Sequence, residues 1–326
     1  MIVKVIKIKK MFIILIILAI LSSIVGSVFL AKSFAKEEEK QEEKKYIKWV
    51  DYNVSLELME KTAKIDINSH NDENSININW IELLAYLASK YGGNFKLFKQ
   101  ADLNNVVERL KSGEKMETIA QNSKLYSYYI EAYTAILDEF IGEYEVEVEN
   151  EDGAKEIKKK YGIKAFLPIA KNYGFSHYDD FGNARSYGYK RVHLGNDLMG
   201  AIGTPIIAVE GGIVEACGWN QYGGWRIGIR SFDGKRYYYY AHLRKDRPYA
   251  KDMCEGKVVK AGEVIGYLGM TGYSVKENVN NINVPHLHFG MQLIFDESQK
   301  EGVNQIWIDV YNIINFLKKN KAEVKK

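Results

Sequence analysis

Cysteine is almost absent from this chain: Cys217 and Cys254 are the only two among 326 residues. Two cysteines allow one disulfide at most in an oxidising compartment. They lie far apart in the sequence and nothing local indicates that they meet, so unpaired thiols packed as small apolar side chains are at least as well supported. Because no cysteine lies near the hydrophobic amino terminus, a lipid-modified lipoprotein is also disfavoured.

The chain also lacks a strong excess of charge of one sign. Its formal net charge is +3, from 45 basic and 42 acidic residues. Residues 1–35 hold five of the lysines and no acidic residue, so the rest of the chain has 40 basic and 42 acidic side chains. Nucleic-acid binding needs a concentrated positive surface. The sequence therefore predicts no nucleic-acid partner.

One long hydrophobic run is present, at the amino terminus. Residues 11–31 contain no charged side chain and are rich in Ile, Leu and Val, and four lysines precede them. About 20 apolar residues cross the ~30 Å hydrocarbon core as a helix, and a positive flank stays in the cytoplasm. We therefore expect residues 1–35 to form a cytoplasmic flank and a single-pass transmembrane anchor, with the other domains extracellular.

A cleavable signal peptide is the alternative for the same segment. Ser33-Phe34-Ala35 resembles the small-x-small pattern at which such peptides are cut, and the protein would then be secreted. The apolar cores of signal peptides usually span only ~7–15 residues, however. An anchor retained in the cell membrane is the preferred prediction. Residues 36–45, nearly all Glu, Lys and Gln, are predicted to form a charged stalk.

Residues 46–145 have the pattern of a small helical domain, because apolar side chains recur at helical spacing and glycines follow each stretch. Asn79 followed by Glu82 favours a helix start. His70 lies in a polar run and is expected in an exposed loop. Such apolar stripes usually form the core of a bundle, although docking of a protein partner is the alternative. The predicted helices cover residues 79–91, 102–112 and 125–141.

After this helical part the pattern changes to short strands. Residues 146–164 are charge-rich and are predicted to be a linker. Short runs rich in β-branched and aromatic residues follow, separated by glycines and by turn pairs such as Asp233-Gly234. They predict a mainly antiparallel β domain over residues 165–326, with a terminal helix over 306–316. The expected fold class is α+β.

Four of the six histidines lie in three short motifs, His193-Leu-Gly-Asn-Asp197, Tyr240-Ala-His242 and His286-Leu-His288. Side chains alternate along a strand, so His286 and His288 share one face. His193 and Asp197 are separated by an even number of residues and can also share a face. Two imidazoles and a carboxylate, with a fourth position left for water, are the ligands of a catalytic zinc site. The pattern predicts a zinc hydrolase.

These motifs belong to a longer ordered series, which also contains Gly203-Thr-Pro205, Gly212-Ile-Val214 and Gly269-Met-Thr-Gly-Tyr-Ser274. The series resembles the lysostaphin and LytM family of zinc metallopeptidases, which cleave peptide bonds in bacterial peptidoglycan. The resemblance covers roughly residues 165–300. It implies the family's duplicated hybrid motif fold and a zinc metalloendopeptidase that remodels the cell wall, with peptidoglycan peptides as partners. Together with the anchor predicted from residues 11–31, this gives a membrane-anchored, extracellular enzyme as the expected function.

The resemblance also implies a role for each polar residue of the site. His193, Asp197 and His288 are expected to bind Zn²⁺, while His242 and His286 stay off the metal and act in catalysis. Zinc with three protein ligands lowers the pKa of a bound water to ~7 and polarises the scissile carbonyl. No His-Glu-x-x-His helix supplies a glutamate base. The two free histidines are therefore expected to accept the water's proton, steady the oxyanion and protonate the leaving amine.

Tyr187, six residues before the first ligand, is a further catalytic candidate, in the place of a tyrosine that helps stabilise the oxyanion in relatives. His177 is matched by no family motif and is predicted to be a loop residue. The chain departs from the family at three places near the expected groove, which leaves the bond that is cleaved open. These are Tyr-Gly-Gly-Trp at 222–225, an inserted asparagine-rich loop at 275–284, and Gly290 in place of a common glutamate.

A non-enzymatic function is the main alternative. Some relatives keep the fold, lose metal ligands and act as cell-division activators or as scaffolds in sporulation. The complete ligand set favours an enzyme, because a scaffold has no chemical need for zinc. A third interpretation is that the helical region covers the groove and regulates the enzyme. High Ile, Lys and Asn usage indicates an AT-rich genome and a Gram-positive bacterium.

Overall fold

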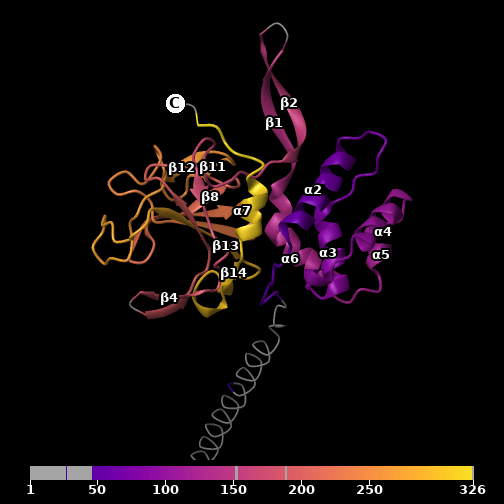
Figure 1. The fold of residues 1–326 in the computed structure, drawn as a ribbon, viewed down its shortest axis with the longest axis horizontal. Helices are drawn as coiled ribbons and strands as arrows, with labels where there is room; N and C mark the ends of the chain where they lie inside the picture. Colours follow the sequence, from indigo (N-terminus) through magenta and orange to yellow (C-terminus); the bar gives the residue numbers. More distant parts are fainter. Residues whose placement is uncertain (1–26, 28–45, 151–152, 188, 325–326) are drawn as a thin grey trace, which may run out of the picture. The chain divides into compact units, whose positions relative to one another are not determined.

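The computed structural model describes residues 27, 46–150, 153–187 and 189–324. From Ile47 onward the chain forms one compact unit, in which helices and a large antiparallel sheet contribute to a common hydrophobic core. In Figure 1 helix α7 lies between the sheet and the other helices. The predicted mixture of helices and antiparallel sheet is confirmed.

The predicted anchor, residues 1–35, and the predicted stalk, residues 36–45, lie outside the described residues apart from Ser27. Within the part that is described, no helix has the length and apolar character needed to cross a membrane. The anchor, its cleaved alternative and the location outside the cell therefore stay predictions.

Helices α3 (Trp80–Tyr91), α4 (Gln100–Lys111) and α6 (Tyr126–Leu137) lie close to the three predicted ones, although α6 ends at Leu137 rather than at residue 141, and α2 and α5 were not predicted. The Asn79 side chain accepts hydrogen bonds from the backbone N–H groups of Ile81 and Glu82, at 2.7 and 3.2 Å, and so caps α3. Gly92 ends that helix with φ of 59°, a left-handed conformation that glycine adopts without strain. The helical elements are α2 Leu56–His70, α3 Trp80–Tyr91, η1 Phe95–Leu97, α4 Gln100–Lys111, α5 Met116–Ala120, α6 Tyr126–Leu137 and η2 Asp138–Phe140.

The expectation of an exposed loop at His70 is wrong. His70 is the last residue of α2, its ring stacks on that of Tyr161 at a centroid distance of 4.0 Å, and its Nδ1 lies 3.1 Å from Oδ1 of Asp66. Asp66 is buried, and it also accepts hydrogen bonds from the Tyr161 hydroxyl and the Trp80 backbone N–H. The polar run misled the prediction because these polar groups pair with one another inside the fold.

The predicted linker, residues 146–164, forms most of a long antiparallel hairpin. Strands β1 (Ile141–Glu149) and β2 (Lys155–Ile163) pair from Ile141 opposite Ile163 to Glu149 opposite Lys155. The hairpin projects beyond the other elements in Figure 1. Acidic side chains on one strand face lysines on the other, as in the ion pair of Glu147 with Lys155 at 2.5 Å, and opposite charges across a hairpin stabilise it. The charge that suggested a linker is thus used in strand pairing.

The large sheet has the order β11-β8-β9-β10-β13-β6-β3, and β14 also pairs with β13. Two small sheets, β7 with β12 and β4 with β5, lie apart from it. The strands are β3 Phe175–Ser176, β4 Ala184–Tyr187, β5 Tyr189–Val192, β6 Asn196–Gly200, β7 Pro205–Ile207, β8 Gly212–Asn220, β9 Gly224–Ser231, β10 Arg236–Ala241, β11 Val258–Val259, β12 Val264–Tyr267, β13 His286–Leu293 and β14 Ile306–Ile308; short helices η3 (Glu297–Gln299), η4 (Gly302–Asn304) and α7 (Tyr311–Leu317) complete this part.

The terminal helix begins later than predicted. Residues 306–308 form β14, whose Ile306 and Ile308 are buried and pair with β13. Asp309 then accepts a hydrogen bond from the backbone N–H of Tyr311 at 2.8 Å, and α7 starts there. The apolar spacing of this short segment fits both elements, and pairing with β13 selects the strand.

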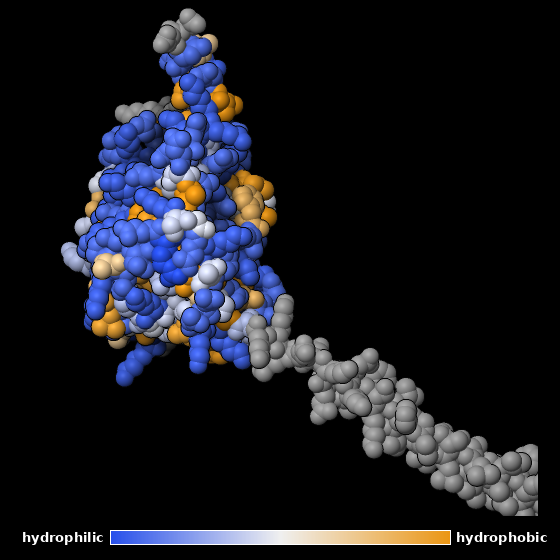
Figure 2. Space-filling view, turned by 90° about the vertical axis from the view of Figure 1, so that its right-hand side faces the viewer, coloured by the Kyte–Doolittle hydropathy of each residue, from blue (hydrophilic) through white to orange (hydrophobic). Residues whose placement is uncertain are grey.

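The helical region and the sheet share one core. Tyr238 and Tyr240 of β10, two residues apart and on the same face of the strand, are fully buried. Trp80 of α3 stacks on Phe316 of α7 at a centroid distance of 5.6 Å. The buried Arg236 of β10 donates a hydrogen bond of 2.9 Å to a carbonyl of α6. The face shown in Figure 2 is mostly hydrophilic, with hydrophobic residues in small separate patches. The boundaries assigned from the sequence stay predictions.

Candidate metal centre

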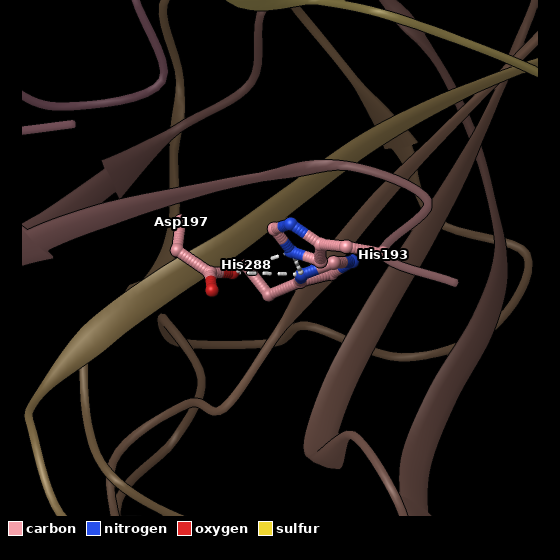
Figure 3. A group of neighbouring side chains, drawn as sticks. All are labelled: His193, Asp197 and His288. Atoms are coloured by element: carbon pink, nitrogen blue, oxygen red, sulfur yellow. Dashed lines mark hydrogen bonds and ion pairs between the residues drawn. The ribbon is translucent and has the colours of Figure 1, made fainter. Parts of the chain in front are cut away.

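Two neighbouring strands bring the predicted metal ligands together. β6 pairs with β13 in a register that sets Asp197 directly opposite His288. His193 lies between β5 and β6, and its ring points to the same place (Figure 3). One ligand atom from each of these residues lies within 4.8 Å of the other two. The three residues predicted as ligands therefore lie side by side.

The donor atoms form a small triangle. Oδ1 of Asp197 lies 3.0 Å from Nε2 of His193 and 2.9 Å from Nδ1 of His288, and the two nitrogens are 3.1 Å apart. Donors that share one tetrahedral zinc ion at ~2.0–2.2 Å lie roughly 3.3 Å from each other. The three atoms would need to separate by only a few tenths of an ångström. Two imidazole nitrogens and a carboxylate oxygen are also donors that zinc prefers, so the residues fit the ion.

Burial and hydrogen bonding set the charges of the triangle. Burial opposes ionisation of Asp197, but hydrogen bonds from His193 and His288 outweigh it and hold the pKa of this carboxyl well below its usual value. Burial lowers the pKa of His288, although Asp197 opposes this. Burial acts in the same direction on His193, but the hydrogen bond and charge of Asp197 prevail and raise its pKa. Asp197 ionised and His288 neutral are the forms that a metal requires.

Asp180, which the sequence analysis missed, lies behind His193. Its Oδ1 is buried, lies 3.1 Å from Nδ1 of His193 and has no hydrogen-bond partner among the described residues. Nη2 of Arg185 lies at the same distance from Nδ1, pairs with Asp180 and lies 3.5 Å from Oδ2 of Asp197. If Nε2 of His193 bound a metal, the ring proton would sit on Nδ1. Nδ1 would then face Asp180 as a donor, and it could not accept a hydrogen bond from Arg185. Such carboxylate partners orient metal-binding histidines.

His242 and His286 lie beside the triangle. Nδ1 of His242 is 2.9 Å from the carbonyl oxygen of Thr271, and Nδ1 of His286 is 2.8 Å from that of Val284. Both Nδ1 atoms therefore carry the proton and donate it, which leaves each Nε2 free to accept one. The two rings are 4.8 Å apart, and Nε2 of His286 is 3.7 Å from Oδ1 of Asp197. The structure thus places two proton acceptors next to the candidate metal ligands.

The backbone and the surroundings of His242 are unusual. It follows β10 with φ of 62°, a left-handed conformation that is rare outside glycine and that often marks functional sites. Burial, together with the nearby His286 and His288, lowers the pKa of His242 to about 3. The ring is therefore neutral at neutral pH.

The structure tests His177, the remaining histidine of this part of the chain, but not Tyr187. Tyr187 is the last residue of β4, but its side chain lies outside the described part, so its role stays a prediction. His177 does not join the triangle; its Nδ1 lies 2.7 Å from Oδ1 of Asn196 and its Nε2 3.1 Å from Oδ1 of Asn315. These contacts account for His177 as a structural residue.

The triangle and both free histidines line one cavity of about 420 Å³. Its walls include Arg185 and Arg191 of the β4–β5 hairpin, the Tyr222-Gly223 turn, and Asn281 to Asn283 of the inserted loop. Two of the three family departures thus line the site. Among the described residues, none of the N-terminal helices contributes to the wall.

The third departure has a steric cause. A Cβ on Gly290 would lie 2.8 Å from the ring of Trp307 and 3.0 Å from the carbonyl oxygen of Leu194. Contacts this short are not found between real atoms of these kinds without a shift of the neighbours. The Trp307 ring therefore occupies the space that a glutamate at this position would need.

Comparison with known proteins agrees with this geometry. Residues 191–304 match the sequence model of peptidase family M23. The chain carries a peptidase family M23 domain. The chain is 41% identical over 131 residues to the L-Ala–D-Glu endopeptidase of Bacillus subtilis, and 39% identical over 99 residues to lysostaphin of Staphylococcus simulans. The matches cover 40% and 30% of this chain but only 38% and 17% of those proteins. The predicted resemblance is confirmed for the M23 domain.

The fold extends beyond the M23 domain in one solved structure. That structure, from Ruminococcus gnavus and provisionally described as a glycyl-glycine endopeptidase lytM, aligns with a TM-score of 0.55 over 85% of this chain and 92% of its own. The sequences are 22% identical over this alignment. The two proteins thus share a fold that includes part of the helical region as well as the M23 domain.

Proposed function

We propose that this protein is a zinc metalloendopeptidase that hydrolyses peptide bonds in bacterial peptidoglycan during cell-wall remodelling. The observation that carries the proposal is the triangle of His193, Asp197 and His288 in one cavity with two further histidines. Membership of the M23 domain in a family of zinc-dependent peptidases supports it, as do relatives named for the endopeptidase reactions that they catalyse.

Three atoms would hold the metal: Nε2 of His193, Nδ1 of His288 and Oδ1 of Asp197. A zinc ion held by these atoms would supply Lewis-acid chemistry: it would lower the pKa of a water towards neutrality and polarise the scissile carbonyl. Asp197 supplies one negative charge, because its lowered pKa keeps it ionised at neutral pH. Asp180 accepts the Nδ1 proton of His193 and so fixes the ring with Nε2 facing the other donors.

His286 and His242 would move the proton. Nδ1 of His286 donates to the Val284 carbonyl oxygen and its Nε2 lies near the donor triangle, so Nε2 is the atom placed to accept a proton from the attacking water. Nε2 of His242 is also available, and its neutral ring can pass a proton to the leaving amine or steady the oxyanion. Tyr187 is proposed to assist at the oxyanion.

We also propose that the protein is held outside the cell by a single membrane anchor in residues 11–31, or is secreted if that segment is cut. The support is the uncharged run and its lysine-rich flank. A protein partner of the helical region would use its outer face, because the apolar faces of α2, α3 and α6 pack in the core.

The proposal is tested with the purified full chain, zinc and purified cell walls, by measuring newly released amino groups. We expect release that a chelator and His288→Ala both abolish. The matched control is His177→Asn, which changes a histidine outside the cavity and should retain activity. A zinc-loaded wild-type chain that releases no amino groups would refute the enzyme, and a chain that also binds no zinc would favour the scaffold alternative.

A further inference from the structure

Two arginines lie next to each other on one wall of the cavity. In the β4–β5 hairpin Arg185 is the direct cross-strand partner of Arg191, and both side chains line the cavity of the metal triangle. Like charges directly opposite each other destabilise a strand pair. Such an arrangement needs negative partners, so the partners of each arginine indicate what the wall is built to bind.

Arg185 has its negative partners within the protein. Its Nη2 pairs with Asp180 and lies 3.5 Å from Oδ2 of Asp197. Its charge is therefore balanced by the carboxylates that hold and surround the metal triangle, and it has no need of a ligand.

Arg191 has no ion pair with a carboxylate among the described residues. Its Nη2 donates a hydrogen bond to the hydroxyl of Tyr273, and its guanidinium carbon lies 4.5 Å from the centre of the Tyr273 ring. Tyr273 also lines the cavity and packs against His242, with ring centroids 5.7 Å apart. The guanidinium is thus held in place on the His242 side of the site, with N–H groups left over.

The charges of the residues that line the cavity also favour a negatively charged ligand. Among the described lining residues the ionisable acid is Asp197, which is engaged with the metal triangle, whereas Arg185 and Arg191 are both positive. A bound divalent ion would add to the positive potential. The planar guanidinium fork of arginine suits a carboxylate, which it can bind through two parallel hydrogen bonds.

We propose that Arg191 binds a carboxylate of the substrate, and that the protein therefore acts on acidic stem peptides in preference to uncharged bridge peptides such as oligoglycine. The inference rests on the proposed peptidase function and names its substrate class. Because Arg191 lines the same cavity of about 420 Å³ as the metal triangle, the carboxylate belongs to a residue that flanks the scissile bond.

The test compares native peptidoglycan with the same material after its free carboxyl groups are converted to carboxamides. This probe does not require the cleaved bond to be known in advance. We expect the wild-type full chain with zinc to cut native material at least ~10-fold faster, the typical value of one charge-assisted hydrogen bond. Arg191→Gln should slow cleavage of native material to the rate on amidated material and leave the latter unchanged, and Arg191→Lys should be intermediate.

Arg247→Gln is the matched control, since Arg247 is exposed and does not line the cavity; it should keep the full preference. Equal wild-type rates on the two materials would overturn the inference while leaving the peptidase function intact. If Arg191→Gln slowed cleavage of native and amidated peptidoglycan equally, the inference would also be overturned, because equal slowing is the effect expected of a structural role. If the wild type cuts neither material, the proposed function fails, and sedimentation with native and amidated peptidoglycan still measures whether Arg191 binds the carboxylates.

Discussion

Asp197 and His288 stand directly opposite each other on strands β6 and β13, with Oδ1 2.9 Å from Nδ1. Side chains on a strand alternate between its two faces, so a slip of one residue between β6 and β13 would send one of the two to the other face. The site therefore depends on strand register as much as on residue identity. His286 lies two residues before His288 on the same strand, and its position is fixed by the same pairing.

Asp197→Asn keeps the shape of the side chain and removes its charge. We expect zinc affinity to fall by more than the ~10–100-fold that loss of an outer partner costs, because a ligand itself is changed. Bound zinc per chain is measured by elemental analysis after dialysis. Asp252→Asn, at an exposed carboxylate far in sequence from the triangle, is the control. A full equivalent of tightly bound zinc in Asp197→Asn would contradict the assignment of this ligand.

Asp180→Asn tests the carboxylate behind His193. We expect ~10–100-fold weaker zinc binding, since the partner that selects the Nδ1 proton is weakened. Competition with a chelator of known affinity measures this without any assay of activity. The adjacent Asp179 contacts Asp309 instead, so Asp179→Asn serves as the control. Unchanged affinity in Asp180→Asn would show that Asp180 does not position the ligand.

The metal-free protein should lose stability as the pH falls below the pKa of an ordinary histidine. Burial and nearby histidines lower the pKa of His242 to about 3, compared with ~6.5 in an unfolded chain. Between these values the unfolded chain binds a proton that the folded chain excludes, so the free energy of unfolding falls as the pH is lowered. This group contributes at most ~1.4 kcal/mol per pH unit. Urea unfolding at several pH values in this range measures how the free energy of unfolding changes with pH. This change should be smaller for His242→Gln than for the wild type, and equal changes would be inconsistent with the buried neutral ring.

Arg236 ties the sheet to the helical region. It is fully buried, donates to Glu210 at 2.8 and 3.1 Å and to the carbonyl of Ala135 at 2.9 Å. Arg236→Met would leave Glu210 as an uncompensated buried charge, which typically costs ~3–5 kcal/mol. Urea unfolding measures the loss. The double variant Arg236→Met with Glu210→Leu should recover much of it, and a double variant no more stable than the single one would exclude this explanation.

Gly290→Glu introduces the residue common in relatives. The new Cβ would meet the Trp307 ring at 2.8 Å, so we expect a loss of ~1–3 kcal/mol, the usual cost of overpacking. Thermal unfolding checks this. In a Trp307→Ala background the same substitution should cost less, whereas an equal cost in both backgrounds would point to the Leu194 carbonyl as the obstacle instead.

The metal triangle could be predicted because the ordered motifs resemble those of the lysostaphin and LytM family, and that resemblance selects His193, Asp197 and His288 as ligands. The side chains of His286 and His288 repeat with the period of a strand, and ordered motifs surround them. Asp180 could not be found in this way, since it reaches His193 from an irregular segment that no periodicity describes. The structure of residues 306–308 was also beyond local pattern, because pairing with β13 decides it. At His70, a polar run looked exposed because Tyr161, whose ring stacks on that of His70, comes from a distant strand, and because the local pattern does not show that Asp66, one helical turn earlier, is buried.

The stacking of Trp80 on Phe316 joins an early helix to the last one. In this protein the helices and the sheet are therefore parts of one structural unit rather than two separate domains. Heating should melt helices and strands together in one cooperative transition, as in small single domains.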